Sequence, residues 1–243
     1  FDAKNSIFTG GGTVGHTLIY PHPDYGEACE QVAISKGLFF RKDDIHHGVR
    51  KAMKLYKIRT TENSSLWADD QTISNFFIEI FGEIFSHCLI SNGHEISDGF
   101  AEHLGSLVLE NYHSKNYWEI FDGVIPTLNY LNNKGYVLGI YSDWWSELPD
   151  LLHQLELKKF FQFIYTSAGL GVAKKQNGAF KELAKVTQIS PLKTAFIGDS
   201  LELDIMPAHS IGMKTVWINH NNKSVPHDVI SITSFDKITQ LFT

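Results

Sequence analysis

The sequence predicts an α/β protein, with a doubly wound parallel sheet and an inserted helical domain. From about residue 136 onward, short apolar runs alternate with amphipathic stretches, which is the pattern of βα units. Between about residues 24 and 118, apolar residues recur instead at helical spacing. The length of 243 residues allows a core domain that carries a smaller inserted one.

Four apolar runs in the C-terminal half are predicted strands, and each of them ends in polar or small residues. Helix-like segments at residues 146–157 and 178–189 lie between them. In parallel sheets covered by helices, ligands bind at the carboxyl ends of the strands, so we expect the polar tips to form a binding edge. The predicted strands are YVLGIYSD, FFQFIYTS, KTAFIGDS and MKTVWINH.

The N-terminal half contains four predicted helices. The first begins after Asp24, whose side chain suits an N-cap, and it ends near Gly37. The second covers residues 43–57, and the third carries a wide apolar stripe from Ile73 to Cys88. The fourth, within residues 96–112, again has one apolar face. These stripes predict the core of a helix bundle rather than a cofactor site.

The two patterns also predict the domain boundaries. We place the core domain at residues 1–13 and 119–243, and the helical cap domain at residues 14–118. The glycine-rich stretch at residues 9–15 resembles a phosphate-binding loop, but no Gly-Lys-Ser/Thr sequence follows it. We therefore interpret this stretch as a flexible connection into the cap.

Composition disfavours several classes of protein. The net charge is −6 and no run of Lys and Arg occurs, which argues against a nucleic-acid partner. Cys29 and Cys88 are too few for a disulfide framework, so we expect both to pack as small apolar groups. The longest apolar stretch is interrupted by Glu79 and Glu83, so no membrane span is predicted.

Four short motifs carry the residues that predict chemistry. Each one holds charged or hydroxyl side chains next to a predicted strand end, where a sheet of this kind binds ligands. The motifs are FDAKNS with Asp2 and Lys4, YSD with Ser142 and Asp143, GVAKK with Lys174, and GDSLELD with Asp199 and Asp204.

In this order and at these separations, the four motifs resemble those of the haloacid dehalogenase superfamily with a helical type 1 cap. The chain is most similar to the eukaryotic branch described as haloacid dehalogenase-like hydrolase domain-containing proteins. The resemblance covers essentially the whole chain, including FDGVIPTLNYLNNKGYVLGIYSD, which leads into the second motif. It implies a Rossmann-like core and a Mg²⁺-dependent phosphohydrolase that acts on a small phosphorylated metabolite through an aspartyl-phosphate.

The resemblance also implies a role for each matched residue. Asp2 is the expected nucleophile, Ser142 is expected to hydrogen-bond the phosphoryl oxygens, and Lys174 to steady their charge. Mg²⁺ is expected to bind Asp2, Asp199 and Asp204, together with the main-chain carbonyl of Lys4. Mg²⁺ would then offset the repulsion between the attacking Asp2 carboxylate and the phosphoryl oxygens.

Several residues depart from the family pattern. Lys4 replaces a second aspartate that protonates the leaving group, and an ammonium cannot act as that base without a large fall in its pKa. Asn5 stands where glycine is common, and Ser6 where threonine is. Asp143 replaces an asparagine and could instead cap a helix. A Lys175-Gln176-Asn177 sequence replaces Pro-Asp-Pro.

Two functions therefore stay open on the sequence alone. The chain could be a phosphohydrolase whose activity is weak because Lys4 replaces the acid–base aspartate. It could instead be a non-catalytic subunit whose partners are the proteins of a larger assembly. Dehalogenation is disfavoured, because the acid-rich GDSLELD motif is typical of metal-dependent phosphatases.

The first motif also bears on the natural N-terminus and on the compartment. The family's sheet needs a strand that ends at Asp2, yet only Phe1 precedes that residue here. We therefore expect the natural protein to begin further upstream. The chain starts without a Met and directly at a motif, so a targeting segment cannot be seen in it, and the compartment stays open, with an intracellular location (cytoplasmic or mitochondrial) favoured.

Overall fold

The computed structural model of the chain describes residues 6–9, 14–95 and 97–242. Its contacts divide the chain into two compact units. The sheet unit comprises Trp67–Asp69, Ile120–Thr243 and the described part of Phe1–Tyr20, and the helical unit comprises Pro21–Leu66 and Asp70–Glu119. This division groups residues 14–20 with the sheet, whereas the sequence analysis assigned them to the cap. Where the chain passes between units, β2 (Ile19–Pro21) and β3 (Trp118–Ile120) form a two-stranded sheet.

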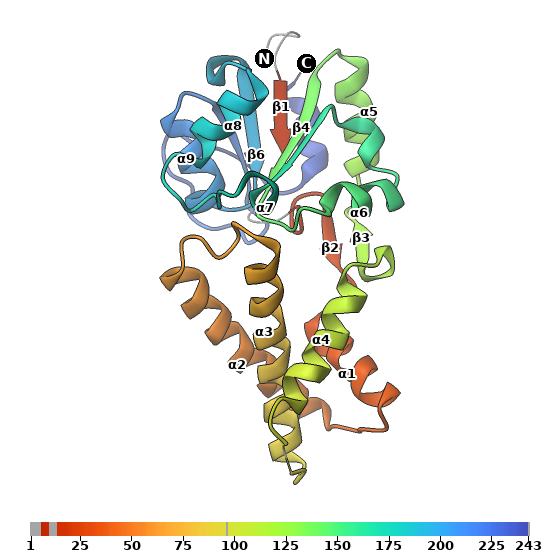
Figure 1. Ribbon diagram of the computed structural model, residues 1–243. Coiled ribbons are helices and arrows are strands. Elements are labelled where there is room, and N and C mark those ends of the chain that lie inside the picture. Colours follow the sequence, from red (N-terminus) through yellow and green to blue (C-terminus); the bar gives the residue numbers. More distant parts are fainter. Residues whose placement is uncertain (1–5, 10–13, 96, 243) are drawn as a thin grey trace. The chain divides into compact units, whose positions relative to one another are not determined.

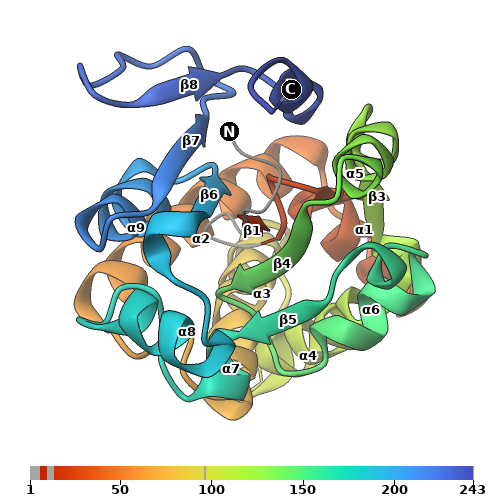
Figure 2. The same ribbon diagram turned by 90° about the horizontal axis from the view of Figure 1, so that it is seen from above.

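The sheet unit is built on six parallel strands (Figures 1 and 2). They are β1 (Ser6–Thr9), β4 (Val137–Ser142), β5 (Phe163–Thr166), β6 (Thr194–Gly198), β7 (Lys214–Ile218) and β8 (Ile230–Ile232). Their order across the sheet is β5-β4-β1-β6-β7-β8. The four strands predicted from the sequence are confirmed as β4 to β7, and the doubly wound α/β fold is confirmed with them. Neither β1 nor β8 was predicted.

The position of β1 corrects the interpretation of the first motif. Ser6, matched above to the motif's threonine, is the first residue of β1 and pairs with Val137 at the start of β4. Val137 lies five residues before Ser142, which is about 16 Å along a strand. Ser6 therefore lies at the amino edge of the sheet, opposite the edge that Ser142 marks. Asp2, Lys4 and Asn5 lie outside the described residues.

Helices cover both faces of the sheet, as expected of a doubly wound fold (Figure 2). On one face, Phe180 packs edge-on against Tyr141 and Phe196, with ring centroids 5.5 and 4.9 Å apart. Phe180 belongs to α8 (Ala179–Thr187), so this cluster fixes that helix against the central strands. On one side of the sheet lie α5 (Val124–Asn133) and α6 (Leu148–Gln154), and on the other α8 (Ala179–Thr187) and α9 (Met206–Ser210).

The helical unit contains the four predicted helices. The N-cap at Asp24 is confirmed, since its side chain accepts a hydrogen bond from the Glu27 amide and the Glu27 side chain accepts one from the Asp24 amide. The aromatic stripe on the third helix is buried inside this unit, with Phe76 5% and Phe85 0% exposed. The helices are α1 (Tyr25–Ser35), α2 (Lys42–Glu62), α3 (Asp70–Ser91) and α4 (Phe100–Tyr112).

Helix α3 is long and apolar enough to cross a membrane by length and composition alone. More than half of its apolar window, 56%, is buried within the protein. Its buried side chains instead pack against α2 and α4, so the helix serves as the centre of the bundle. Cys29 and Cys88 are buried, as expected for small apolar groups, and burial raises the pKa of both thiols.

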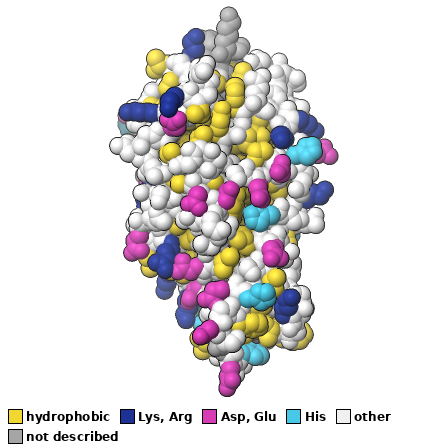
Figure 3. Space-filling model, in the orientation of Figure 1, with side chains coloured by type: hydrophobic (Ala, Val, Ile, Leu, Met, Phe, Trp, Pro, Cys, Tyr) yellow, Lys and Arg dark blue, Asp and Glu magenta, His cyan; other side chains and the backbone are white. Residues whose placement is uncertain are grey.

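Charged side chains of both signs are interspersed on the face shown in Figure 3. No broad patch of Lys and Arg occurs on that face.

The close approach of α3 and α4 depends on a glycine. A methyl group at Gly105 would lie 2.8 Å from the Ile78 carbonyl oxygen and 3.0 Å from the Gly82 amide nitrogen. We expect Gly105→Ala to lower the free energy of unfolding by about 1–3 kcal/mol, because the two backbones must move apart. Glu110→Ala, at an exposed position of the same helix, is the control. Equal stability of the two variants in urea unfolding would contradict this packing.

Candidate active site

Ser142 ends strand β4 at the carboxyl edge of the sheet and is fully buried. Its hydroxyl oxygen accepts a hydrogen bond of 2.6 Å from the Val14 backbone amide. The contact joins segments 128 residues apart in the chain. Because the oxygen accepts this bond, the hydroxyl keeps its own proton to donate elsewhere.

The segment Val14–Thr17 reaches the same edge. His16 has a left-handed backbone, with φ at +75°, and the Thr17 hydroxyl donates to Asp199 Oδ1 at 3.3 Å. A left-handed residue followed by a hydroxyl residue is what the resemblance gives to the end of the first motif, where glycine and threonine are usual. The segment was not predicted to belong to the site, because the adjoining glycines locally indicate a flexible connection. Gly10 to Thr13 lie outside the described residues.

Lys174 and Asp204 form a fully buried ion pair. Lys174 Nζ lies 2.7 Å from Asp204 Oδ1, and neither side chain is exposed to solvent. The other carboxylate oxygen, Oδ2, accepts a hydrogen bond of 3.0 Å from the Ser200 amide. Burial raises the pKa of Asp204 to about 7, although the charge of Lys174 lowers it. The pair joins the loop after β5 to the π-helical turn Leu201–Ile205 after β6.

Gly198, the last residue of β6, has no side chain, and the Asp204 carboxylate lies in the space that a side chain would fill. A methyl group there would lie 2.6 Å from Asp204 Oδ2 and 2.7 Å from Asp204 Cγ. These distances are shorter than any relaxed contact, so the Asp204 carboxylate occupies space that only glycine leaves open. Asp199 follows directly, and its carbonyl oxygen accepts a hydrogen bond from Trp217 Nε1 at 2.9 Å.

Asp143 positions Lys174 through the backbone. Its Oδ1 accepts a hydrogen bond of 3.0 Å from the Lys174 amide, and the residue is 1% exposed. Burial raises the pKa of Asp143 to about 6, while the nearby charge of Lys174 lowers it. The helix-cap interpretation of Asp143 was wrong, because helix α6 has Glu147 at its N-cap position.

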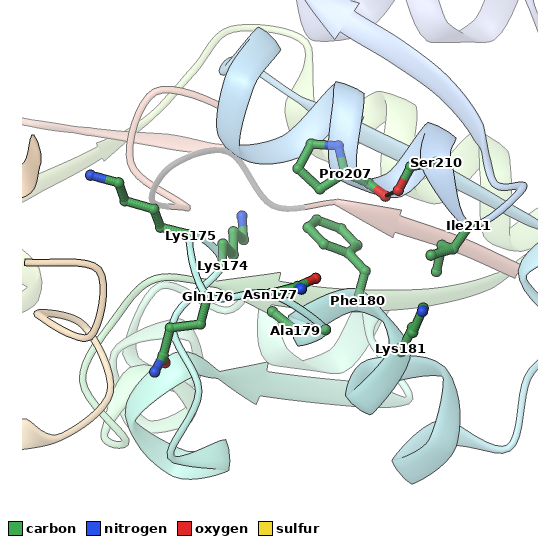
Figure 4. Close-up of a pocket in the computed structure, with 11 residues that line it drawn as sticks. Lys174, Lys175, Gln176, Asn177, Ala179, Phe180, Lys181, Pro207, Ser210 and Ile211 are labelled. Carbon is green, nitrogen blue, oxygen red and sulfur yellow. Dashed lines mark hydrogen bonds between the residues drawn. The ribbon is translucent and has the colours of Figure 1, made fainter.

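The loop after Lys174 keeps an ordered form despite the loss of Pro-Asp-Pro. Gln176 Oε1 accepts a hydrogen bond of 2.7 Å from the Ala173 amide, which closes the turn. Figure 4 shows this loop and the start of α8 on one side of a pocket of about 410 Å³, with Pro207, Ser210 and Ile211 on the other. Because the Lys174 ammonium is paired with Asp204, the lysines of this pocket that reach solvent are Lys175 and Lys181.

The described residues do not by themselves make up a magnesium site. Both oxygens of Asp204 already accept hydrogen bonds, and Asp199 Oδ1 accepts one from Thr17. No group of three His, Cys, Asp or Glu side chains in the described part of the chain could hold a metal. Mg²⁺ prefers several oxygen ligands in octahedral geometry. Asp2 and Lys4, the other expected ligands, lie outside the described residues.

The structure thus brings together four of the predicted site residues. Ser142, Lys174 and Asp204 are buried, while Asp199 is partly exposed. Lys174 pairs directly with Asp204, and the charge of Asp199 raises the pKa of Asp204. The arrangement offers a hydroxyl and a compensated ammonium, which are groups that bind a phosphate oxygen.

Comparison with known proteins points to one family. A sequence profile described as "Haloacid dehalogenase-like hydrolase" matches residues 69–218. The chain is 26% identical to haloacid dehalogenase-like hydrolase domain-containing protein 3 of Xenopus laevis, over 85% of this chain and 82% of that protein. It is 27% identical to the glyceraldehyde 3-phosphate phosphatase of Pyrococcus abyssi, over 76% of this chain and 82% of that protein.

Other alignments are shorter, and the fold is shared more widely than the sequence. Those with the bovine and mouse counterparts of the Xenopus protein span 43% of those proteins. Among solved structures, the HAD-hydrolase YfnB from Bacillus subtilis bound to magnesium superposes with a TM-score of 0.69 at 20% identity. That superposition covers 98% of this chain and 99% of that one.

The buried carboxyl of Asp143 predicts a pH-dependent stability difference. Folding raises its pKa from 3.8 to about 6, so the folded chain holds the proton more tightly than the unfolded one. Ionisation of Asp143 as pH rises from about 4 to 6 therefore lowers the free energy of unfolding, on the order of 3 kcal/mol. Asp143→Asn keeps the Oδ1 acceptor without the charge. We expect its advantage over wild type to grow from pH 4 to pH 7.

Thermal unfolding across this pH range measures the difference between the two proteins. Asp150→Asn, at an exposed site in α6, is the matched control and should show no such trend. A difference in Tm between Asp143→Asn and wild type that stays constant or shrinks with rising pH would contradict the raised pKa of Asp143.

Gly198→Ala tests the packing of the ion pair. The added methyl must displace Asp204, and moving one partner of a buried pair leaves charge uncompensated. We expect a loss of about 1–3 kcal/mol or more in the free energy of unfolding. Chemical denaturation beside Lys193→Ala, an exposed position just before β6, measures it. Wild-type stability of Gly198→Ala would show that the carboxylate is not held there.

Proposed function

The chain belongs to the haloacid dehalogenase-like hydrolase family, and from that premise we propose that it binds the phosphate of a small phosphorylated molecule at the carboxyl edge of its sheet. The observation that carries the proposal is the meeting of Ser142, Lys174, Asp199 and Asp204 at that edge. The glyceraldehyde 3-phosphate phosphatases among the relatives support a small phosphorylated ligand.

Two groups supply the binding. The Ser142 hydroxyl accepts from Val14 and can donate its proton to a phosphate oxygen. The Lys174 ammonium supplies positive charge, and Asp143 fixes its loop through the backbone amide. A bound phosphate would replace Asp204 as the partner of the Lys174 ammonium. The Asp204 carboxyl would then be left without its ion pair, and its raised pKa favours the protonated, neutral form.

We further propose that hydrolysis is weak or absent. An aspartyl-phosphate route needs a carboxylate nucleophile and a proton-transfer group at this edge. The described segment at the edge, Val14–Thr17, contains no acid, and the sequence has no Asp or Glu between Asp2 and Asp24. Asp2 stays the nucleophile that the sequence predicts, yet it precedes β1, whose first residue lies at the opposite edge. That order favours a site without its nucleophile.

The magnesium ion that the family uses would neutralise phosphate charge when bound. Because the described carboxylates are engaged with Lys174, Ser200 and Thr17, no step of this proposal passes through the ion.

A second candidate function is a non-catalytic interaction subunit. The internally paired Lys174 and Asp204 favour it, because each charge already has its partner without any ligand. The aromatic stripe of α3 is not the surface for a partner, since it is buried within the helical unit. The two candidates differ in one measurable property, which is the binding of inorganic phosphate.

Phosphatase assays test the proposed loss of turnover. Wild type, Asp2→Asn and Lys4→Asp are compared with an aryl phosphate and with glyceraldehyde 3-phosphate, in the presence of Mg²⁺. We expect all three to stay near the background rate, because no carboxylate of the described segment Val14–Thr17 reaches the edge. Binding of inorganic phosphate by calorimetry is measured in parallel and should be retained by all three.

Three other results of these assays would contradict the proposed function, each in a different way. Brisk turnover by wild type that Asp2→Asn abolishes would establish Asp2 as the nucleophile. A gain of about 10²- to 10⁴-fold in Lys4→Asp would restore the general acid–base role to that position. Failure of every variant to bind phosphate would remove the proposed ligand and favour the interaction subunit.

A further inference from the structure

A second pocket of the sheet unit lies beside Asp199, at the carboxyl end of β7. Its volume is about 520 Å³, within the range of pockets that bind small molecules. The pocket near Lys174 has Phe180 as its aromatic lining residue, whereas this one is lined by two aromatic and two imidazole rings. The lining residues are His16, Phe121, Asp199, Trp217, Ile218, Asn219, His220, Asn221 and Lys223.

One wall is a stacked pair of rings. Phe121 and His220 lie with centroids 5.6 Å apart and planes 21° from parallel. His220 Nε2 lies 2.7 Å from the His16 carbonyl oxygen, which can only accept, so the imidazole carries a proton on Nε2. Tyr20 contacts the Phe121 ring, with centroids 4.7 Å apart. The stacked Phe121 ring and the His16 carbonyl oxygen therefore fix the orientation of the His220 ring in the absence of a ligand.

The loop that presents His220 is also fixed in advance. The Asn219 side chain is 5% exposed and makes two hydrogen bonds to the Lys223 backbone, at 2.8 and 2.9 Å. Asn222 adopts a left-handed backbone, with φ at +48°, and its amide donates to the Asn219 carbonyl. This closed turn places His220 and Lys223 on the pocket without further ordering, which lowers the entropic cost of binding.

The pocket is continuous with the site through Asp199. Trp217 lines it and holds the Asp199 carbonyl oxygen, and Thr17 holds the Asp199 carboxylate. His16 lies one residue before Thr17, so the ring wall and the phosphate edge share one segment of backbone. Asp199 therefore belongs both to the edge and to the pocket, and a ligand would have to extend past Asp199 to occupy the two together.

We propose that this pocket binds the planar heterocycle of a phosphate monoester, as found in a nucleoside 5′-monophosphate. The inference rests on the proposed function, because the phosphate of the same molecule occupies the edge. A flat ring pair favours a flat partner, since rings attract one another in stacked arrangements. Base–aromatic stacking is strong enough to shift affinity by about tenfold or more. Lys223 adds a positive charge that suits an anionic ligand.

Calorimetric titration separates the contribution of the phosphate to binding from that of the heterocycle. The probes are adenosine 5′-monophosphate, glyceraldehyde 3-phosphate, which is a phosphate ester without a ring, and inorganic phosphate. We expect wild type to bind the nucleotide about tenfold more tightly than the other two. His220→Ala should lose this gain and keep its affinity for phosphate. His220→Phe, which keeps a ring, should retain most of the gain.

His227→Ala serves as the matched control, because His227 is fully exposed and absent from the pocket lining. Equal affinity of wild type for the nucleotide and for phosphate would overturn the inference. So would a nucleotide gain that survives in His220→Ala. If phosphate alone fails to bind, the proposed function is wrong. Nucleotide binding that His220→Ala abolishes would then still support the pocket.

Discussion

The buried ion pair between Lys174 and Asp204 is the interaction on which the site depends. Removing two charges from water is costly, so the pair persists only where its geometry and remaining hydrogen bonds are satisfied. The structure supplies these conditions through three neighbours. Gly198 leaves the space, the Ser200 amide holds the second oxygen, and Asp143 holds the Lys174 backbone. Sheet, loop and turn are thereby fixed to one another at the carboxyl edge.

The same pair limits the chemistry. The Asp204 carboxylate already accepts one hydrogen bond on each oxygen, so a metal ion would have to compete with the Lys174 ammonium for it. With Asp199 holding Thr17, the described acids serve mainly to organise the edge. In the proposed function, Ser142 and Lys174 contact a phosphate oxygen, and this binding requires fewer of the family's groups than hydrolysis does. Under the proposed function, the chain recognises a phosphate with little or no turnover.

Much of this arrangement could be predicted from the sequence. Strands β4 and β6 combine short apolar runs with polar ends, so local pattern was sufficient to find Ser142 and Asp199. Lys174 was found through the motif GVAKK, which lies beyond a short helix (Ser167–Leu170) rather than at a strand end. Strand β1 was missed because it has four residues and is followed by glycines, which locally predict a connection. Its place is set by pairing with β4 and β6, more than 120 residues away.

Contacts between distant segments account for the other differences. The bond from Val14 to Ser142 spans 128 residues, and no local pattern encodes it. The role of Asp143 was missed for the same reason, because its partner is the Lys174 amide rather than a nearby helix end. Motif matching identified FDAKNS by its letters, whereas the described sheet brings the later segment Val14–Thr17 to the edge.

The most direct test of the account is to locate a phosphate analogue in an experimental structure. Crystals of the protein soaked with tungstate would reveal the anion by its anomalous scattering. The account predicts one strong peak at the carboxyl edge, with oxygens about 3 Å from Ser142 Oγ and Lys174 Nζ. A saturated crystal with its peak elsewhere, or with the Lys174–Asp204 pair intact and no anion at that edge, would contradict it.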